Sequence, residues 1–305
     1  MQQPIRIGTR DSKLALWQAH TVQALLEKHG ATTELVPVKS EGDLDLITPL
    51  YAMGVQGVFT KGLDAFLLSN KIDIAVHSLK DVPTQLAQGL AQAAVLPRAS
   101  YKDLFVPHPQ STTFGSAKIA TGSIRRKAQW LNQYPGSIIE NLRGNVQTRI
   151  RKLEESDWDG AIFAAAGLDR MEMRPDNAIE LDWMLPAPAQ GAVMVACRAE
   201  STDLLELCSK FNNEPTALCV QIERDFLRTL MGGCSTPISA LAEIINGEMH
   251  FKGNILSIDG TEKMEIEKIC PLNDAVNAGI LWGNELLQKG ADKIVASIRN
   301  FGQNL

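Results

Sequence analysis

The chain has 305 residues, of which 45% are hydrophobic and 21% are charged, and its formal net charge is −5. This length is too great for one ordinary compact domain and fits two or three. The composition argues against disorder and against a coiled coil. No apolar run approaches the roughly 18–20 residues that span a bilayer, and the N-terminal segment lacks the apolar core of a secretory signal. We therefore expect a cytoplasmic protein that binds no membrane, and the negative charge argues against a nucleic-acid partner.

The five cysteines are odd in number and scattered, with no CxxC pair. A disulfide framework or a structural zinc site is therefore not expected, which again fits a reducing compartment. The five histidines are equally dispersed and show no metal-ligand spacing. We expect no metal site.

The first part of the chain alternates between strand and helix patterns. Strands are predicted near residues 5–7, 34–38 and 73–76, and helices at 13–29 and 59–68. The first helix has a stripe of apolar residues, which consists of Leu14, Trp17, Leu25 and Leu26. Between the strand at 34–38 and the helix at 59–68, glycines and a proline indicate a long connection at 41–58. Such alternation predicts a mostly parallel sheet, with ligands at its carboxyl edge.

A second unit of the same kind runs from about 101 to 185. Its strands are predicted at 117–121, 137–141 and 160–164, and its helices near 123–133, 145–154 and 167–172. Short proline-containing segments at 97–100 and 185–191 are typical of crossings between domains. The apolar strand 192–197 is expected to return to the first sheet. Two such lobes would form a cleft.

The last part of the chain has a different pattern. It predicts a helix at 215–231, and a turn at Asp259-Gly260 between the second and third of three strands. The remaining expected elements are strands at 237–245, 248–258 and 261–269, a helix at 273–289 and a strand at 293–298. We therefore predict three domains: 1–98 with 190–210, then 99–189, then 211–305.

Two candidate site segments lie in the first domain. In the first, Thr9, Arg10 and Ser12 stand between a strand and a helix, where backbone amides and the helix dipole favour an anion. The plainer alternative is an N-cap beside a surface arginine. In the second, Ser78, Lys80 and Asp81 follow a buried strand, and Asp81 could act as a general acid or oppose a cation. The alternative there is a surface ion pair.

The second domain carries a larger cationic set at its strand-to-helix junctions. Arg125 and Arg126 stand in the first turn of a helix, where a positive charge opposes the dipole unless an anion binds. The set also includes Arg143, Arg149 and Arg170, and the uncharged Thr121, Ser123 and Gly144 lie at the same junctions. Since arginine binds carboxylates and phosphates bidentately, and no P-loop motif is present, we expect a ligand with several carboxylates or phosphates.

Cys234 follows two glycines in a predicted loop, where a thiol is accessible and can act as a nucleophile. The alternative is an incidental loop thiol. The other cysteines are interpreted as small core residues.

Taken together, these segments resemble the porphobilinogen deaminase family along essentially the whole chain. The matching stretches occur in the family's order, and they are TRDSKLALWQAH, FTKGLDAFLL, DIAVHSLKDVP, GSIRRKAQ, LRGNVQTR, AAAGLDR, PAPAQGA and GGCSTPI. The resemblance implies an α/β fold of two periplasmic-binding-protein-like lobes, with mixed, mostly parallel sheets, and a small C-terminal α+β domain.

The resemblance also implies a transferase reaction. A dipyrromethane cofactor would be joined to Cys234 by a thioether, and four porphobilinogens would be added head to tail, with loss of ammonia, to give the linear tetrapyrrole hydroxymethylbilane. Asp81 would be catalytic. The implied cofactor-binding residues are Cys234, Lys80, Ser78, Thr121, Ser123, Arg125, Arg126, Gly144 and Arg149. The implied substrate-binding residues are Arg10, Ser12, Phe59, Arg143, Arg170 and Gln190.

Four positions depart from the family pattern: a lysine is replaced near Gln56, and other family residues are replaced by Gly62, Gly122 and Ala189. Two rival functions are a carboxylate-binding receptor without catalysis and an anion-sensing regulator. The receptor gives Cys234 no role and normally carries an export signal, which is not found here. No helix-turn-helix or basic DNA-reading element supports the regulator. The resemblance further implies a monomer whose product passes to a tetrapyrrole-cyclising enzyme.

Overall fold

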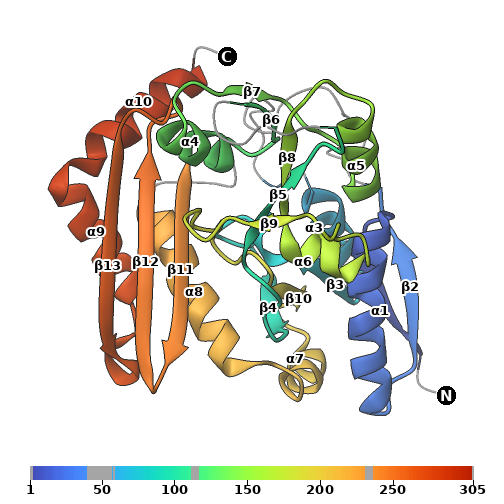
Figure 1. Cartoon of the computed structure of the whole chain (residues 1–305). Coiled ribbons are helices and arrows are strands. Elements are labelled where there is room, and N and C mark those ends of the chain that lie inside the picture. The colour runs from blue at the N-terminus through green and yellow to red at the C-terminus, as the bar shows by residue number, and fades with distance from the viewer. Residues whose placement is uncertain (1–2, 40–56, 58, 111–116, 231–235, 304–305) are drawn as a thin grey trace. The chain divides into compact units, whose positions relative to one another are not determined.

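The protein is described from a computed structural model (Figure 1), which covers residues 3–39, 57, 59–110, 117–230 and 236–303. The described residues fall into two compact units, each of which is considered by itself. The first holds the described residues up to Ala99 together with Gly191–Leu218, and the second holds Ser100–Gln190 and Cys219–Leu305. The connection expected at 41–58 lies almost entirely outside the described residues, as do Gln56 and Cys234. Among the described helices, none has the length and apolar character that crossing a membrane requires.

The first unit is built on a five-stranded sheet with the strand order β2-β1-β3-β10-β4. Strands β1, β2 and β3 pair in parallel, whereas β10 is antiparallel to both of its neighbours. The elements of this unit are β1 (Ile5–Thr9), α1 (Lys13–Lys28), β2 (Thr33–Pro37), α3 (Lys61–Leu68), β3 (Ile74–Ser78), the 3-10 turn η2 (Leu79–Asp81), β4 (Leu90–Val95), β10 (Val193–Arg198) and α7 (Thr202–Ser209). The predicted return of segment 192–197 to this sheet is confirmed by β10.

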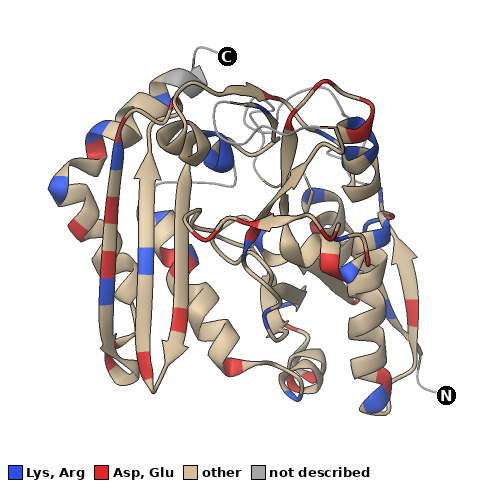
Figure 2. Cartoon of the chain, in the orientation of Figure 1, with Lys and Arg blue, Asp and Glu red and all other residues tan. Residues whose placement is uncertain are grey.

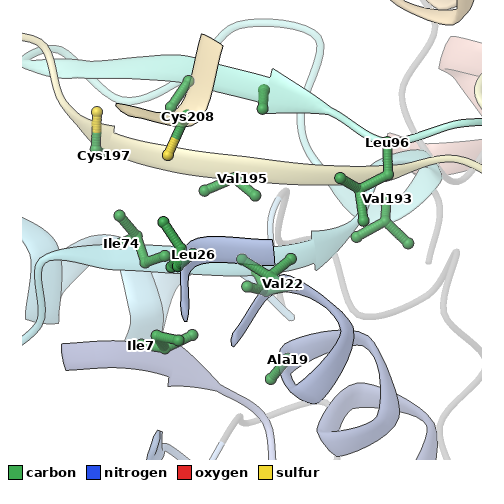
Figure 3. Close-up of a cluster of buried hydrophobic side chains, with 13 residues drawn as sticks. Ile7, Ala19, Val22, Leu26, Ile74, Leu96, Val193, Val195, Cys197 and Cys208 are labelled. Atoms are coloured by element: carbon green, nitrogen blue, oxygen red, sulfur yellow. The ribbon is translucent and has the colours of Figure 1, made fainter. Parts of the chain in front are cut away.

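The core of the first unit joins α1 to the sheet, and Figure 3 shows side chains of β1, β3, β10 and α1 together. Helix α1 buries one stripe of side chains, which consists of Ala15, Gln18, Ala19, Val22 and Leu26. The predicted stripe was wrong in part, because Trp17 is 41% exposed. Alanines at the interface let the helix backbone approach the strands closely, so the small residues face the core and the large ring does not.

The second unit contains a sheet with the equivalent order, β7-β6-β8-β5-β9. Strands β6, β7 and β8 are parallel, and β5 is antiparallel to β8 and β9. The elements are β5 (Asp103–Pro107), β6 (Lys118–Ala120), α4 (Ile124–Gln133), β7 (Ile138–Glu140), α5 (Val146–Glu154), β8 (Gly160–Ala164), α6 (Ala165–Arg170) and β9 (Ile179–Glu180). In each sheet, the reversed strand is the one that adjoins a crossing between the units.

The C-terminal part of the second unit is a three-stranded antiparallel sheet with helices. Its elements are α8 (Glu214–Thr229), whose residues up to Leu218 belong to the first unit, β11 (Ile238–Ile245), β12 (Glu248–Leu256), β13 (Lys263–Pro271), the 3-10 turn η3 (Leu272–Asp274), α9 (Ala278–Leu286), the turn η4 (Leu287–Ala291) and α10 (Asp292–Gln303). The predicted turn is confirmed by Gly260, whose φ is +75°. Charged side chains alternate along the outer strand β13 (Figure 2), which protects a sheet edge from further pairing.

One predicted element was wrong: residues 293–298 belong to helix α10 rather than to a strand. Ala291, Ile294 and Val295 are buried while the intervening side chains are exposed, and this spacing is helical. The β-branched pair in this segment suggested a strand because the buried positions were not known. The predicted fold class is confirmed: two α/β sheets of mixed, mostly parallel strands, and a small α+β part.

Candidate functional site

The predicted site residues of the first unit lie at the carboxyl ends of β1 and β3. These two strands are parallel neighbours, since Ile7 pairs with Ile74 and Gly8 with Ala75. Arg10 and Ser12 therefore leave the same edge of the sheet as Ser78 and the η2 turn that follows it. This is the edge at which the sequence predicted a ligand.

At the end of β1, the chain turns directly into α1. Ser12 is the N-cap, and its Oγ accepts a hydrogen bond from the Ala15 amide at 3.3 Å. Arg10 places its guanidinium carbon 4.3 Å from the centroid of the Phe59 ring, a cation–π contact. The structure thus brings together Arg10 and Phe59, two predicted substrate-binding residues from separate segments.

At the end of β3, the η2 turn presents Lys80 and Asp81, which are both half-buried. Ser78 is fixed by the buried side chain of Gln18, whose Nε2 donates to Ser78 Oγ at 2.9 Å. The Leu79 amide donates to the carbonyl of Ala192 at 3.0 Å. The Asp81 carboxylate forms no hydrogen bond or ion pair with any residue that the structure describes. The turn is therefore anchored on both sides while this carboxylate stays available.

His77, which directly precedes this turn, is buried in β3. Burial, together with the positive charge of Arg10, lowers the pKa of His77 to about 4. The imidazole is therefore neutral near pH 7. The cationic groups predicted for this site are thus Arg10 and Lys80, without His77.

In the second unit, the predicted residues follow three adjacent parallel strands, β7, β6 and β8. Thr121 and Ser123 come after β6, Arg143 and Gly144 come after β7, and Arg170 ends the helix that follows β8. All of these segments leave the carboxyl edge of the sheet. The predicted residues of the second unit therefore lie at the carboxyl edge of their sheet, as the predicted residues of the first unit do in theirs.

The loop between β6 and α4 is closed by hydrogen bonds from its own side chains. Thr121 is buried, and its Oγ1 accepts from the Ser123 amide at 3.2 Å. Ser123 is the N-cap of α4 and accepts from the Arg126 amide at 3.5 Å. A Cβ built on Gly122 would lie 2.4 Å from the carbonyl oxygen of Leu142. This departure from the family's serine therefore fits a close approach of two backbone segments.

Arg126 is held by Asp103, a residue that the sequence analysis missed. Its Nε and Nη2 donate to Asp103 Oδ1 at 3.1 and 2.7 Å, and its Nη1 donates to the carbonyl of Ile162 at 2.9 Å. Arg126 is 5% exposed and Asp103 is 0% exposed. All three guanidinium nitrogens of Arg126 are therefore bonded inside the second unit.

Arg125 contacts the same aspartate from the neighbouring position. Its Nη2 lies 2.8 Å from Asp103 Oδ2 as an ion pair, although without the angles of a hydrogen bond. Its Nη1 donates to the carbonyl of Leu185 at 2.7 Å. The Nε of Arg125 is buried and has no hydrogen-bond partner among the described residues, so one donor of a side chain that is 4% exposed is left over.

Gln190 completes this group, which we call the Asp103 cluster (Asp103, Arg125, Arg126 and Gln190). Its Nε2 donates to Asp103 Oδ1 at 2.9 Å and to the carbonyl of Tyr101 at 2.7 Å. Burial alone would raise the pKa of Asp103, but the charges of both arginines and the hydrogen bonds bring that pKa down to about 2. The carboxylate is therefore ionised, and the cluster carries a formal charge of +1.

The remaining predicted residues of the second unit lie around the end of β7 and on α6. Arg149 donates from its Nε to the carbonyl of Gly144 at 2.7 Å. Gly144 has a φ of +115°, and Arg143 is buried. Burial lowers the pKa of Arg170, although Asp169 opposes this effect. Arg149 thus orders the glycine turn that carries Arg143.

The predicted nucleophile, Cys234, lies outside the described residues. Of the other cysteines, Cys197, Cys208 and Cys219 are buried. Burial raises the pKa of Cys208 to about 12, and it also raises the pKa values of Cys197 and Cys270. A thiol with a raised pKa is a poor nucleophile, so these three do not compete for the role predicted for Cys234.

Sequence reasoning also missed Glu223, a fully buried carboxylate of α8. It accepts hydrogen bonds from the amides of Ala189 at 2.6 Å and Ala242 at 2.8 Å. For Asp103, the available signal was an acidic residue that opens an apolar strand. For Glu223, it was an acidic residue within the apolar face of a helix.

Comparisons with known proteins cover nearly the whole chain. Residues 5–206 match the sequence model of the porphobilinogen deaminase, dipyromethane cofactor binding domain, and residues 217–288 match that of the porphobilinogen deaminase, C-terminal domain. A porphobilinogen deaminase of Syntrophomonas wolfei is 40% identical over 302 residues, covering 97% of this chain and 99% of the relative. One from Chlorobium phaeobacteroides is 41% identical over 310 residues, covering 98% and 99%.

The solved structures that resemble this chain are distant. An ancestral cationic amino acid solute-binding protein is 14% identical, with a TM-score of 0.43, and the match covers 68% of this chain and 87% of that one. The assignment therefore depends on the sequence matches, which extend through both units and include every motif described above. On that evidence, the chain belongs to the porphobilinogen deaminase family.

Proposed function

We propose that the residues of this chain carry out the hydroxymethylbilane synthase reaction as follows. Membership of the family makes the chain a transferase of tetrapyrrole biosynthesis, which joins four porphobilinogen molecules head to tail, releases ammonia and uses a dipyrromethane cofactor. The family assignment over nearly the full length is the observation that carries this function. The roles of individual residues are inferred from their chemistry and placement.

The described residues fit a cofactor rich in carboxylates. Each pyrrole ring of a dipyrromethane carries an acetate and a propionate. The Asp103 cluster has a formal charge of +1, and the Nε–H of Arg125 has no acceptor among the described residues. A buried cationic group is stabilised by an anion that accepts its remaining hydrogen bond. The cofactor-binding set proposed here is Lys80, Ser78, Thr121, Ser123, Arg125, Arg126, Gly144 and Arg149, with Cys234 as the point of attachment.

Thr121 and Ser123 lie at the N-terminus of α4, where the helix dipole favours a carboxylate. Their hydroxyls already accept hydrogen bonds from the backbone, so their O–H groups can donate to such an anion. When it is bound at Cys234, the cofactor supplies the terminal pyrrole carbon to which new units are added. Cys234 is proposed for the attachment because the described cysteines are buried or have raised pKa values.

Asp81 is the proposed catalytic residue. Loss of ammonia from porphobilinogen leaves a cation spread over the pyrrole ring, and a fixed carboxylate near the ring N–H stabilises it. Asp81 suits this role because the anchored η2 turn fixes it while its carboxylate stays unpaired within the described part of the chain. A preorganised charge of this kind contributes several kcal/mol in the transition state.

Arg10 and Phe59 are proposed to bind the substrate. The aromatic ring of Phe59 lies 4.3 Å from the guanidinium carbon of Arg10 and supports one face of that group, and a planar guanidinium binds a carboxylate through its N–H groups. Ser12, Arg143, Arg170 and Gln190 complete the proposed substrate-binding set. Gln190 would act on the substrate indirectly, through Asp103, because its side-chain amide donates a hydrogen bond to the Asp103 carboxylate.

The remaining proposals concern the protein as a whole. Three sheets support the division into domains 1–98 with 190–210, 99–189 and 211–305. We also propose a cytoplasmic monomer, as the family resemblance implies. We further propose that its product, a linear tetrapyrrole, passes to a tetrapyrrole-cyclising enzyme, as the same resemblance implies.

The test of this function is the covalent adduct. Intact-mass spectrometry of the purified enzyme should show the calculated chain plus a dipyrromethane, and Cys234→Ser should lack that mass. Cys270→Ser is the matched control, because Cys270 is a half-buried thiol of β13 and should leave the adduct in place. Asp81→Asn should keep the adduct but release ammonia from porphobilinogen at least about a hundredfold more slowly.

Two results would contradict the proposal. If active wild-type enzyme carried no added mass, the proposal of a covalent cofactor would be wrong. If Cys234→Ser carried the unchanged adduct, the cofactor would be attached to a residue other than Cys234. Ammonia release by Asp81→Asn within about twofold of wild type would show that Asp81 does not stabilise the cation.

A further inference from the structure

Asp103 is a fully buried carboxylate at the start of β5, the reversed strand of the second sheet. It receives Arg125 and Arg126 from α4 and Gln190 from the end of the second crossing. These contacts join three segments that are far apart in the sequence. The cluster contains one carboxylate and two guanidinium groups.

We infer that Asp103 is a positioning residue, which fixes the guanidinium of Arg125 so that its Nε–H is directed at a carboxylate of the ligand. This inference rests on the proposed function, in which Arg125 binds the cofactor. It assigns different tasks to the two adjacent arginines. Arg126 supports the cluster from within, and Arg125 provides the contact with the ligand.

The geometry supports this division. A guanidinium is planar, so its orientation is set once two of its nitrogens are held. Asp103 Oδ2 lies 2.8 Å from Nη2 of Arg125, and the Leu185 carbonyl accepts from Nη1 at 2.7 Å. The third nitrogen, Nε, is left buried and without a hydrogen-bond partner in the described part of the chain. By contrast, every nitrogen of Arg126 is already bonded.

The charge of Asp103 is what allows the two arginines to lie together. Burial lowers the pKa of Arg125, the Asp103 carboxylate raises it, and the positive charge of Arg126 lowers it further. Without the carboxylate, two buried guanidinium groups would repel each other. Arg125 would then move toward solvent, and its Nε–H would lose its direction.

Gln190 holds Asp103 in turn. Its Nε2 donates to Asp103 Oδ1 and also to the Tyr101 carbonyl, so Gln190, in the second crossing, is tied both to the carboxylate and to the backbone just after the first crossing. A glutamine can do this without changing the charge of the cluster. Gln190 therefore offers a way to disturb the position of Asp103 while its charge is kept.

The first experiment measures the arginine side chains directly. In protein labelled with 15N-arginine, the Nε–H signals of Arg125 and Arg126 should be resolved and protected from exchange, and they can be assigned from Arg125→Lys and Arg126→Lys. In Asp103→Asn, both signals should shift, and they should exchange with water at least about tenfold faster. The measurement does not depend on enzyme activity.

The second experiment follows cofactor assembly on the apoprotein. After porphobilinogen is added, intact mass reports the rate at which the adduct forms. Asp103→Asn should assemble it at least about tenfold more slowly than wild type, because a misplaced binding group carries a large kinetic penalty. Asp103→Glu, which keeps the charge, should recover part of that rate. If Asp103 only maintained packing, the rate of adduct formation would not depend on whether the substituted side chain is charged.

Asp73→Asn is the matched control. Asp73 also joins two arginines, since Oδ1 lies 2.8 Å from Arg6 Nη2 and 3.5 Å from Arg198 Nη2, but it stands at the amino end of β3, away from the predicted site. The same change of carboxylate to amide should therefore lower the thermal stability. It should leave the rate of adduct formation within about twofold of wild type.

If Asp103→Asn does not fold, Gln190→Met decides the matter, since it removes a donor to Asp103 and leaves the cluster charge unchanged. It should shift the Arg125 Nε–H signal and slow adduct formation. Unchanged arginine signals and assembly within about twofold of wild type, in Asp103→Asn or in Gln190→Met, would overturn the positioning role. A wild-type protein that never forms the adduct would instead refute the proposed function, while the arginine signals would still test the geometry.

Discussion

Replacing Glu223 by glutamine tests how the second crossing is attached to the second unit. Glu223 is fully buried in α8, and its two carboxylate oxygens accept from the amides of Ala189 at 2.6 Å and Ala242 at 2.8 Å. Ala189 has a φ of +63°, in the left-handed region that an alanine adopts only at a cost of about 1–2 kcal/mol. The hydrogen bond from its amide helps to hold it there.

The expected loss follows from these contacts. A hydrogen bond to a charged group contributes about 1.5–3 kcal/mol. Glutamine has one acceptor oxygen, so one bond is kept as a weaker neutral bond, and the amide NH2 faces the other backbone N–H. We expect Glu223→Gln to lower the free energy of unfolding by about 2–3 kcal/mol, or the Tm by about 5 °C.

Thermal unfolding measures the loss, and hydrogen exchange locates it. The amides of Ala189 and Ala242 should exchange faster in Glu223→Gln than in wild type. Glu267→Gln is the control, since Glu267 forms an exposed ion pair with Lys252 at 3.0 Å and should cost less than about 1 kcal/mol. A Glu223→Gln protein that melts within about 1 °C of wild type, with unchanged exchange at both amides, would refute the reasoning.

Two further predictions concern the loop before α4 and the response to acid. Gly122→Ser, which restores the family's residue, should destabilise the protein by about 1–3 kcal/mol in urea unfolding, because its Cβ would lie 2.4 Å from the Leu142 carbonyl oxygen; a gain in stability would contradict this. His77 has a pKa of about 4 when folded, so its neutral form contributes stability that is present above about pH 6.5 and lost as the pH falls toward 4. Melting curves across that range should show a shallower loss for His77→Gln than for wild type, and equal slopes would show that His77 is not the group responsible.

The alternating pattern of the sequence predicted most of the two α/β sheets, because their buried strands and amphipathic helices differ in period. It did not reveal β4, β5 or β9. Strand β4 is LAQAAV, whose alanines have little strand preference, β5 is DLFVP, whose apolar run is only three residues long, and β9 has two residues. It also placed a strand at 293–298, where packing selects a helix. These are cases in which tertiary contacts, rather than local preference, decide the element.

The candidate site shows the same division. Residues at strand-to-helix junctions could be predicted, since a cationic residue there has a recognisable position in the sequence. Asp103 could not, because its role depends on Arg125, Arg126 and Gln190, which are brought to it by the fold. For Cys234, the sequence motif is the evidence, since that residue lies outside the described part of the chain.

The place of β10 in the first sheet has a consequence for how the chain is made. This strand lies between β3 and β4, yet it follows every strand of the second sheet in the sequence. A ribosome working from the N-terminus therefore delivers all the strands of the second sheet before it delivers the one that joins β3 to β4. Although synthesis of the first sheet begins first, that sheet is completed after the second. Strands β3 and β4 have no β10 partner until β10, which ends at Arg198, has been synthesised.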